Sequence, residues 1–127
     1  MAKKKVLKLA FIGGGGIARH HANYFSRYDD VSIAAVADIS DDSLKHWKDD
    51  LEVPGYTAYQ EMLQEVKPDL VSICTPNFLH YKPALDAMKS GAHLFIEKPM
   101  AMNSRECRNI ISQGRKLNRK ISIGFQH

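Results

Sequence analysis

Four consecutive glycines in the stretch FIGGGGIARHH separate an apolar run from a helical pattern, and they are the residues with the clearest chemical use. Gly13, Gly15 and Ala18 fit a G-x-G-x-x-G/A spacing, which makes a tight turn, admits a diphosphate to the backbone and lets helix and strand pack closely. The N–H groups and partial positive charge of a helix N-terminus attract that anion. The spacing therefore predicts a diphosphate site in which Gly14 and Gly16 are spare positions, with Gly16 leaving additional room.

Asp38 supplies the second part of this predicted site, because it directly follows the apolar run VSIAAVA. It stands about 20 residues after Ala18, where a dinucleotide-binding fold carries the acid for the adenosine ribose. Its carboxylate can accept two hydrogen bonds from a ribose diol and would repel a 2′-phosphate. By itself the glycine string is also typical of a simple glycine-rich turn, but the two features together predict NAD. NADP stays an alternative, because Arg19 or Lys45 could receive the additional phosphate.

The elements that must position these residues alternate along the chain. Apolar runs predict strands at 6–12, 31–37, 56–57, 70–74, 93–97 and 121–125. Between them, helices are predicted from 17 to about 28, after a Ser40 cap, from about 58 to 66, up to Gly91, and after a capping box of Asn103 and Glu106. Such alternation gives parallel βαβ units with right-handed crossovers. The predicted fold class is α/β: a doubly wound parallel sheet (Rossmann fold) of about six strands with helices on both faces.

Length and composition fit one dinucleotide-binding domain over residues 1–127. The net charge of +4 comes largely from basic runs near both ends, which carry no interleaved aromatic residues, so we expect no nucleic-acid partner. No run approaches the roughly 18 apolar residues of a membrane helix. Cys74 and Cys107 read as small buried hydrophobes without a disulfide, which favours the cytoplasm. No metal-ligand spacing occurs, and neither His20 nor His21 is predicted to act as a catalytic base.

Two further clusters, TPNFLH at 75–80 and EKP at 97–99, each follow a predicted strand. The carboxyl ends of parallel strands meet at the edge of a sheet where ligands bind, so both clusters are candidates for one site. Each also has a plain structural interpretation. TPN makes a good turn with a helix cap, and EKP is compatible with an exposed charged turn.

The stretches FIGGGGIARHH, VADIS, ICTPNFLHYKPALDAMKSGAHLFIEKPMA and IGFQH occur in this order. In order and spacing they resemble the N-terminal domain of the Gfo/Idh/MocA oxidoreductase family, which includes glucose-fructose oxidoreductase and inositol dehydrogenase. The resemblance covers the chain from Lys5 to His127. TPN-x-x-H together with EKP is its specific part, because a glycine string occurs in many unrelated proteins.

The resemblance implies a role for each matched residue. One group would hold the adenosine diphosphate half of the dinucleotide: Gly13, Gly15, Gly16, Ile17, Ala18, Asp38 and Ile39. A second group would line the nicotinamide half: Thr75, Pro76, Asn77, His80, Glu97 and Gln126. Asp38 would bind the adenosine ribose, Ile39 would lie beside the adenine, and Glu97 would bind the nicotinamide ribose. Lys98 would be the catalytic residue that reaches the substrate and stabilises charge on its oxygen, and its bond to Pro99 would be cis.

The same resemblance implies a longer protein. Family members continue with a second α/β domain that carries most substrate contacts and the acid/base histidine, and through which they usually form homo-oligomers; we expect that domain to be absent here. The chain would be the cofactor domain of an NAD(P)-dependent oxidoreductase acting on a sugar, cyclitol or related polyol, and inactive by itself. Two alternatives are a non-catalytic NAD(P)-sensing regulatory protein, against which an intact Lys98 argues, and an NAD-dependent glycoside hydrolase.

Overall fold

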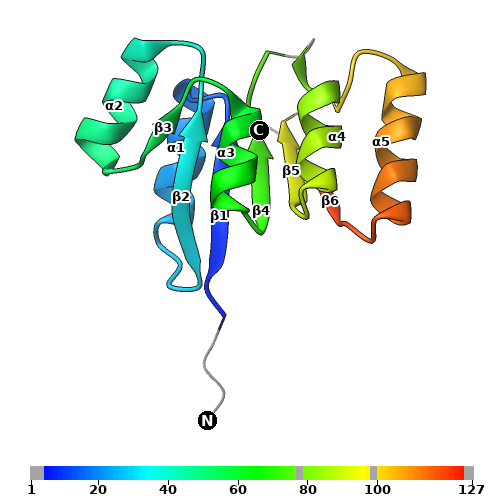
Figure 1. Ribbon diagram of the computed structural model, residues 1–127, viewed down its shortest axis with the longest axis horizontal. Helices are drawn as coiled ribbons and strands as arrows, with labels where there is room; N and C mark the ends of the chain where they lie inside the picture. The colour runs from blue at the N-terminus through cyan, green and yellow to red at the C-terminus, as the bar shows by residue number, and fades with distance from the viewer. Residues whose placement is uncertain (1–4, 77–78, 98–99, 125–127) are drawn as a thin grey trace.

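The computed structural model describes residues 5–76, 79–97 and 100–124. They form a parallel sheet of order β3-β2-β1-β4-β5-β6 (Figure 1). The strands are β1 (Leu7–Ile12), β2 (Val31–Ala37), β3 (Gly55–Tyr56), β4 (Leu70–Ile73), β5 (His93–Glu97) and β6 (Ile121–Gly124). The helices are α1 (Gly16–Phe25), α2 (Asp41–Leu51), α3 (Tyr59–Val66), α4 (Tyr81–Lys89) and α5 (Ser104–Lys116). The predicted doubly wound fold is confirmed.

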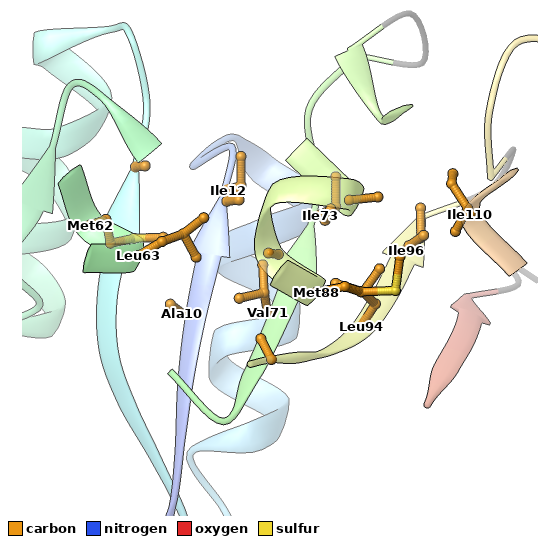
Figure 2. Packing of buried hydrophobic residues seen from close by; sticks show 14 of the residues in the cluster. Ala10, Ile12, Met62, Leu63, Val71, Ile73, Met88, Leu94, Ile96 and Ile110 are labelled. Carbon is orange, nitrogen blue, oxygen red and sulfur yellow. The ribbon is translucent and has the colours of Figure 1, made fainter. Parts of the chain in front are cut away.

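Alternate side chains of the central strand β1 enter two separate cores. Ala10 and Ile12 belong to the core beneath α3, α4 and α5, where Met62, Met88 and other apolar side chains meet the sheet (Figure 2). Leu9 lies on the opposite face, in the core beneath α1 and α2. Because β1 is buried on both faces, its sequence is nearly continuously apolar instead of alternating.

The order of the strands reverses between β1 and β4. The chain runs outward from β1 through β2 to β3, and then crosses to the other side of β1 to form β4. Backbone hydrogen bonds continue the pairing past the strand ends, from Gly13 N to Ala37 O and from Cys74 N to Ile12 O, both 2.8 Å long. The segments that follow β1, β2 and β4 therefore start side by side, at the position where open α/β sheets bind ligands.

Local signals for the helix ends are confirmed in detail. Ser40 Oγ accepts a hydrogen bond from the N–H of Ser43, and Gly91 takes the left-handed conformation, with φ +106°, just after α4. The capping box is present in a modified form: Asn103 Oδ1 accepts from Glu106 N, but Glu106 Oε1 accepts from the N–H of Met102 instead of that of Asn103.

Three sequence expectations need correction. The first helix ends at Phe25, three residues before the predicted end, because the N–H groups of residues 27 and 28 bond carbonyls only three positions back. The two free cysteines, Cys74 and Cys107, are half-buried and not fully buried, although both pack against the cores. Strand β3 lies one residue earlier than predicted. Within the described ranges, no helix is both long and apolar enough to cross a membrane.

Candidate functional site

Gly13 makes the tight turn that the sequence predicted. Its φ of +95° lies in the left-handed region that side chains rarely adopt. A Cβ added there would lie 2.7 Å from both the carbonyl carbon of Cys74 and the nitrogen of Thr75. Both atoms belong to the backbone beyond β4 and cannot move aside, so only glycine fits at this position.

Gly14 is not a spare position, and the prediction that it is dispensable is wrong. Its N–H donates to Asp38 Oδ2 at 2.7 Å, and its carbonyl accepts from Ser43 Oγ and Trp47 Nε1, each at 2.8 Å. A Cβ at Gly14 would lie only 2.8 Å from the Trp47 nitrogen, and that indole is completely buried. Helix α2 therefore clamps the turn through the backbone of Gly14.

The next two glycines face open space. A Cβ built on Gly15 or Gly16 would meet no atom of the described residues within 4 Å. Helix α1 starts at Gly16 without a side-chain cap and without an acidic residue in its first turn. The positive end of α1 is thus open to an anion, as the sequence predicted. Ala18 is fully buried against the sheet, which lets α1 approach closely, whereas Ile17 is exposed.

Asp38 is fixed beside this turn by two backbone donors. Its Oδ2 accepts from Gly14 N and its Oδ1 accepts from Ser40 N at 2.9 Å. A carboxylate has about four acceptor sites, so further hydrogen bonds to a diol are available. The side chain lines a cavity of about 430 Å³ together with neighbours from four other segments: Ile12, Gly13, Ala37, Ile39, Thr57, Tyr59, Thr75, Pro76, Leu79 and Pro83.

Several residues of that cavity were not singled out by the sequence. Tyr59 comes from the start of α3, and its hydroxyl donates to Asp86 Oδ2 at 2.6 Å. Burial, followed by this hydrogen bond and the charge of Asp86, raises the pKa of the Tyr59 phenol. A tyrosine at a helical spacing is typical of an ordinary core residue, so the sequence carried no signal that Tyr59 would line the cavity. By contrast Ile39, predicted beside an adenine, is 90% exposed at the mouth of the cavity.

The turn after β4 is held together by its own polar groups. Thr75 Oγ1 donates to the carbonyl of Leu79 at 3.2 Å, and the Leu79 N–H donates to the carbonyl of Pro76 at 2.8 Å. His80, only 1% exposed, places Nε2 2.7 Å from the Thr75 carbonyl. A carbonyl only accepts, so His80 Nε2 must carry the proton. The observed contact of His80 therefore stabilises the turn.

At the end of β5, Glu97 is buried and contacts His21, which was not predicted to act as a catalytic base. His21 of α1 places Nε2 2.9 Å from Glu97 Oε1. The charge of Glu97 also affects the Cys74 thiol. Burial is the main cause that raises the pKa of Cys74 to about 11; the hydrogen bond with Ser72 lowers this pKa, and the negative charge of Glu97 raises it further. Cys74 is therefore a protonated thiol at neutral pH and not a nucleophile.

Thus the described residues from four strand ends and α1 converge at one edge of the sheet. Four of the residues singled out from the sequence lie outside the described ranges: Asn77, Lys98, Pro99 and Gln126.

The sequence matches the family described as "Oxidoreductase family, NAD-binding Rossmann fold" over residues 7–125. The chain belongs to this family, Gfo/Idh/MocA. The predicted resemblance is therefore confirmed, and the matched region is the family's NAD-binding domain.

Individual relatives agree with this assignment. D-glucoside 3-dehydrogenase of Escherichia coli is 36% identical over 95% of this chain and 35% of its own length. Glycosyl hydrolase family 109 protein 2 of Akkermansia muciniphila is 35% identical over 83% of this chain and 24% of its own length. The crystal structure of myo-inositol 2-dehydrogenase from Lactobacillus plantarum has a TM-score of 0.88 and 26% identity, over 94% of this chain and 36% of that chain. The chain thus spans about a third or less of the length of these proteins.

Proposed function

We propose that this chain is the cofactor domain of an NAD-dependent oxidoreductase that moves hydride between nicotinamide and a carbinol carbon of a sugar, cyclitol or related polyol. The observation that carries the proposal is the open turn at Gly15 and Gly16, which directly adjoins the fixed carboxylate of Asp38. Backbone donors, an accessible helix N-terminus and an acid for a ribose diol then lie on one edge of the sheet.

The adenosine half of the dinucleotide has the more complete set of described residues. The amides at the start of α1, near Gly16 and Ile17, would bind the diphosphate, because no side chain caps them. Asp38 would accept hydrogen bonds from the adenosine ribose, and Ile39 would cover one side of the adenine at the 430 Å³ cavity. Gly13 and Ala18 act by shaping the turn and by seating α1 on the sheet.

The nicotinamide half would be lined by residues that follow β4, β5 and β6. Thr75 and Pro76, where the adenosine cavity reaches the turn after β4, would continue from it into this half. His80 holds the turn by its hydrogen bond with the Thr75 carbonyl. Glu97 would bind the nicotinamide ribose. A further pair from this half was inferred from sequence only: Asn77 and Gln126.

When bound, nicotinamide supplies the hydride acceptor or donor. Lys98, which follows Glu97 directly, would then place its ammonium near the substrate oxygen. A positive charge there stabilises the negative charge that develops as a carbinol loses hydride and its proton. We propose that the acid/base group, most substrate contacts and the surface for homo-oligomers lie in a second domain of the whole protein. A cytoplasmic location is proposed on the two free thiols.

The geometry favours NAD over NADP. Asp38 stands where the 2′-hydroxyl would bind, and its negative charge would repel a 2′-phosphate. Lys45 is exposed on α2 and Arg19 is half-buried on α1, and we propose that either could receive that phosphate if the carboxylate is removed.

A second candidate function is an NAD-dependent glycoside hydrolase, which is favoured by the 35% identity to the Akkermansia muciniphila glycosyl hydrolase. Both functions would use the same nucleotide domain. Product analysis on the whole protein separates them: a dehydrogenase accumulates NADH and a ketone, whereas a hydrolase releases a free sugar with no net change in NAD.

The test of the proposal is a calorimetric titration of the chain with NAD, NADH and NADPH. We expect the wild-type chain to bind NADH, and Asp38→Ala to weaken NADH binding about tenfold or more, since a hydrogen bond to a charged group contributes about 1.5–3 kcal/mol. The same substitution should raise the ratio of NADPH to NADH affinity. Asp49→Ala, an exposed carboxylate on α2, is the matched control and should change neither. A folded wild-type chain that binds none of the three nucleotides would reject the proposal.

A further inference from the structure

We infer that His21 is a positioning residue, which holds the buried carboxylate of Glu97 in place for the nicotinamide ribose by donating a hydrogen bond from Nε2 to Oε1. This inference rests on the proposed function. The inference gives His21 a role, although this residue belongs neither to the G-x-G-x-x-G/A spacing nor to the EKP motif at 97–99. It also links helix α1, which begins at the diphosphate site, to the nicotinamide half of the dinucleotide site.

The contact joins two elements that are far apart in the sequence. His21 lies in the second turn of α1, the helix whose first turn faces the diphosphate site. Glu97 is the last residue of β5, immediately before Lys98. The two side chains meet at 2.9 Å and are 19% and 9% exposed, respectively. A buried carboxylate without a donor is strongly unfavourable, so the hydrogen bond from His21 stabilises Glu97 in this position.

Packing fixes the orientation of the His21 ring. The ring meets Phe95 of β5 edge to face, with the centroids 5.4 Å apart and the planes at 86°. Phe95 and Glu97 point to the same face of β5, because side chains two positions apart in a strand share a face. The strand that carries the carboxylate therefore also carries the aromatic ring that orients its partner.

The position of the proton follows from the surroundings of the ring. Nδ1 of His21 is buried and has no hydrogen-bond partner in the part of the chain that the structure describes. A neutral ring with its proton on Nε2 donates to Glu97 and leaves Nδ1 as an unprotonated nitrogen. A protonated ring would bury an N–H without an acceptor, which is the costlier state.

Charges around the ring act in both directions. Burial lowers the pKa of His21, the Glu97 carboxylate opposes this, and His20 on the same helix adds to the lowering. The charge of Glu97 also acts on the Cys74 thiol, which is protonated at neutral pH. The lowered pKa of His21 favours the neutral ring, in agreement with a single ring proton on Nε2. The bond uses Oε1, so Oε2 stays the acceptor for a ribose hydroxyl.

The test compares three variants of the chain by titration with NADH, ADP-ribose and ADP. His21→Leu removes the donor, His21→Gln offers an amide N–H close to the place of Nε2, and His20→Gln changes the exposed neighbour as a control. ADP lacks the second ribose, whereas ADP-ribose carries it. We expect His21→Leu to weaken NADH and ADP-ribose about tenfold, to leave ADP unchanged, and to be largely rescued in His21→Gln. His20→Gln should bind all three like the wild type.

A double-mutant cycle of His21→Leu with Glu97→Gln shows whether His21 acts on NADH binding through Glu97 or only through the stability of the fold. The double variant His21→Leu/Glu97→Gln should bind NADH no more weakly than Glu97→Gln alone, because both changes disable the same contact. Equal NADH affinity in wild type and His21→Leu overturns the inference, and so does a loss that extends equally to ADP. If the folded wild-type chain binds ADP but neither NADH nor ADP-ribose more tightly, the assignment of the nicotinamide half in the proposed function fails with it.

Discussion

Two acids mark the two halves of the candidate site, and they are held in different ways. Asp38, after β2, accepts hydrogen bonds from two backbone N–H groups, those of Gly14 and Ser40. Glu97, at the end of β5, is held by the side chain of His21 among the residues that the structure describes. The first arrangement depends on the course of the backbone alone, and the second depends on how a helix docks and which rotamer its histidine takes.

In the turns beside the acids the pattern is reversed. The turn after β1 is clamped by Ser43 and Trp47 of α2, which both donate to one carbonyl. The turn after β4 is closed by Thr75 and His80 within its own segment. Bonds to the N–H and to the carbonyl of Gly14 preorganise the adenosine half, so substitutions there should affect every adenine nucleotide. Substitutions in the nicotinamide half should affect only ligands that carry the second ribose.

The largest effects are expected from alanine substitutions at Gly13 and Gly15, which should act on stability and on nucleotide binding, respectively. Gly13→Ala should destabilise the fold by roughly 3 kcal/mol or more, because the backbone is strained and the new Cβ meets the backbone after β4. Gly15→Ala should leave the free energy of unfolding nearly unchanged, since φ is −75° and nothing lies near the new Cβ. It should nonetheless weaken NADH and ADP together, because the methyl group occupies the space of the diphosphate. Urea unfolding and calorimetry measure the two effects.

Asp49→Ala on α2 again serves as the control and should change neither the free energy of unfolding nor the affinity for ADP, because its side chain is exposed. A Gly15→Ala chain that binds ADP like the wild type would show that the diphosphate does not approach this turn. The assignment of the adenosine half to the turn after β1 would then be wrong.

A smaller effect is expected at the clamp on Gly14. Trp47→Phe removes the indole N–H that donates to the Gly14 carbonyl and leaves space in the core beside Phe11. We expect a loss of about 2 kcal/mol in the free energy of unfolding and a fall of several fold in the affinity for both ADP and NADH. Ser43→Ala, which removes only the other donor, should lose about 1 kcal/mol. An affinity change confined to NADH would contradict the division into two halves.

The smallest effect is a dependence of stability on pH. His93 Nδ1 accepts a hydrogen bond from Lys120 N at 2.9 Å, which requires an unprotonated nitrogen. Burial, followed by the charges of Arg119 and Lys120, lowers the pKa of His93 below its ordinary 6.5. The unfolded chain therefore takes up protons first, so this contribution is complete above about pH 6.5 and declines as the pH falls toward the folded pKa.

The lowered pKa of His21 acts in the same direction. His93→Asn, whose amide oxygen can accept at every pH, should flatten the fall in unfolding free energy between pH 7.5 and 5.5. His20→Asn serves as the exposed-histidine control. If the slope is the same in His93→Asn and the wild type, the bond to Lys120 does not depend on an unprotonated ring.

Much of the fold followed from the sequence because its signals are local. Apolar runs locate the strands, the Ser40 and Asn103 side chains start two helices, and Gly91 ends one. The Gly13 turn and the acid after β2 were predicted for the same reason. A strand, a turn and a helix N-terminus are consecutive in the chain, so their spacing is fixed by covalent geometry.

By itself the sequence determined the order of strands and helices, the turn at Gly13 and the family to which the chain belongs. The tertiary structure alone decided that Gly14 is indispensable and that His21 partners Glu97. Both depend on helix packing: α2 brings Trp47 onto the turn after β1, and α1 brings His21 to the end of β5. A sequence read in local windows carries no signal for these contacts, because the partners are distant in the chain and ordinary in type.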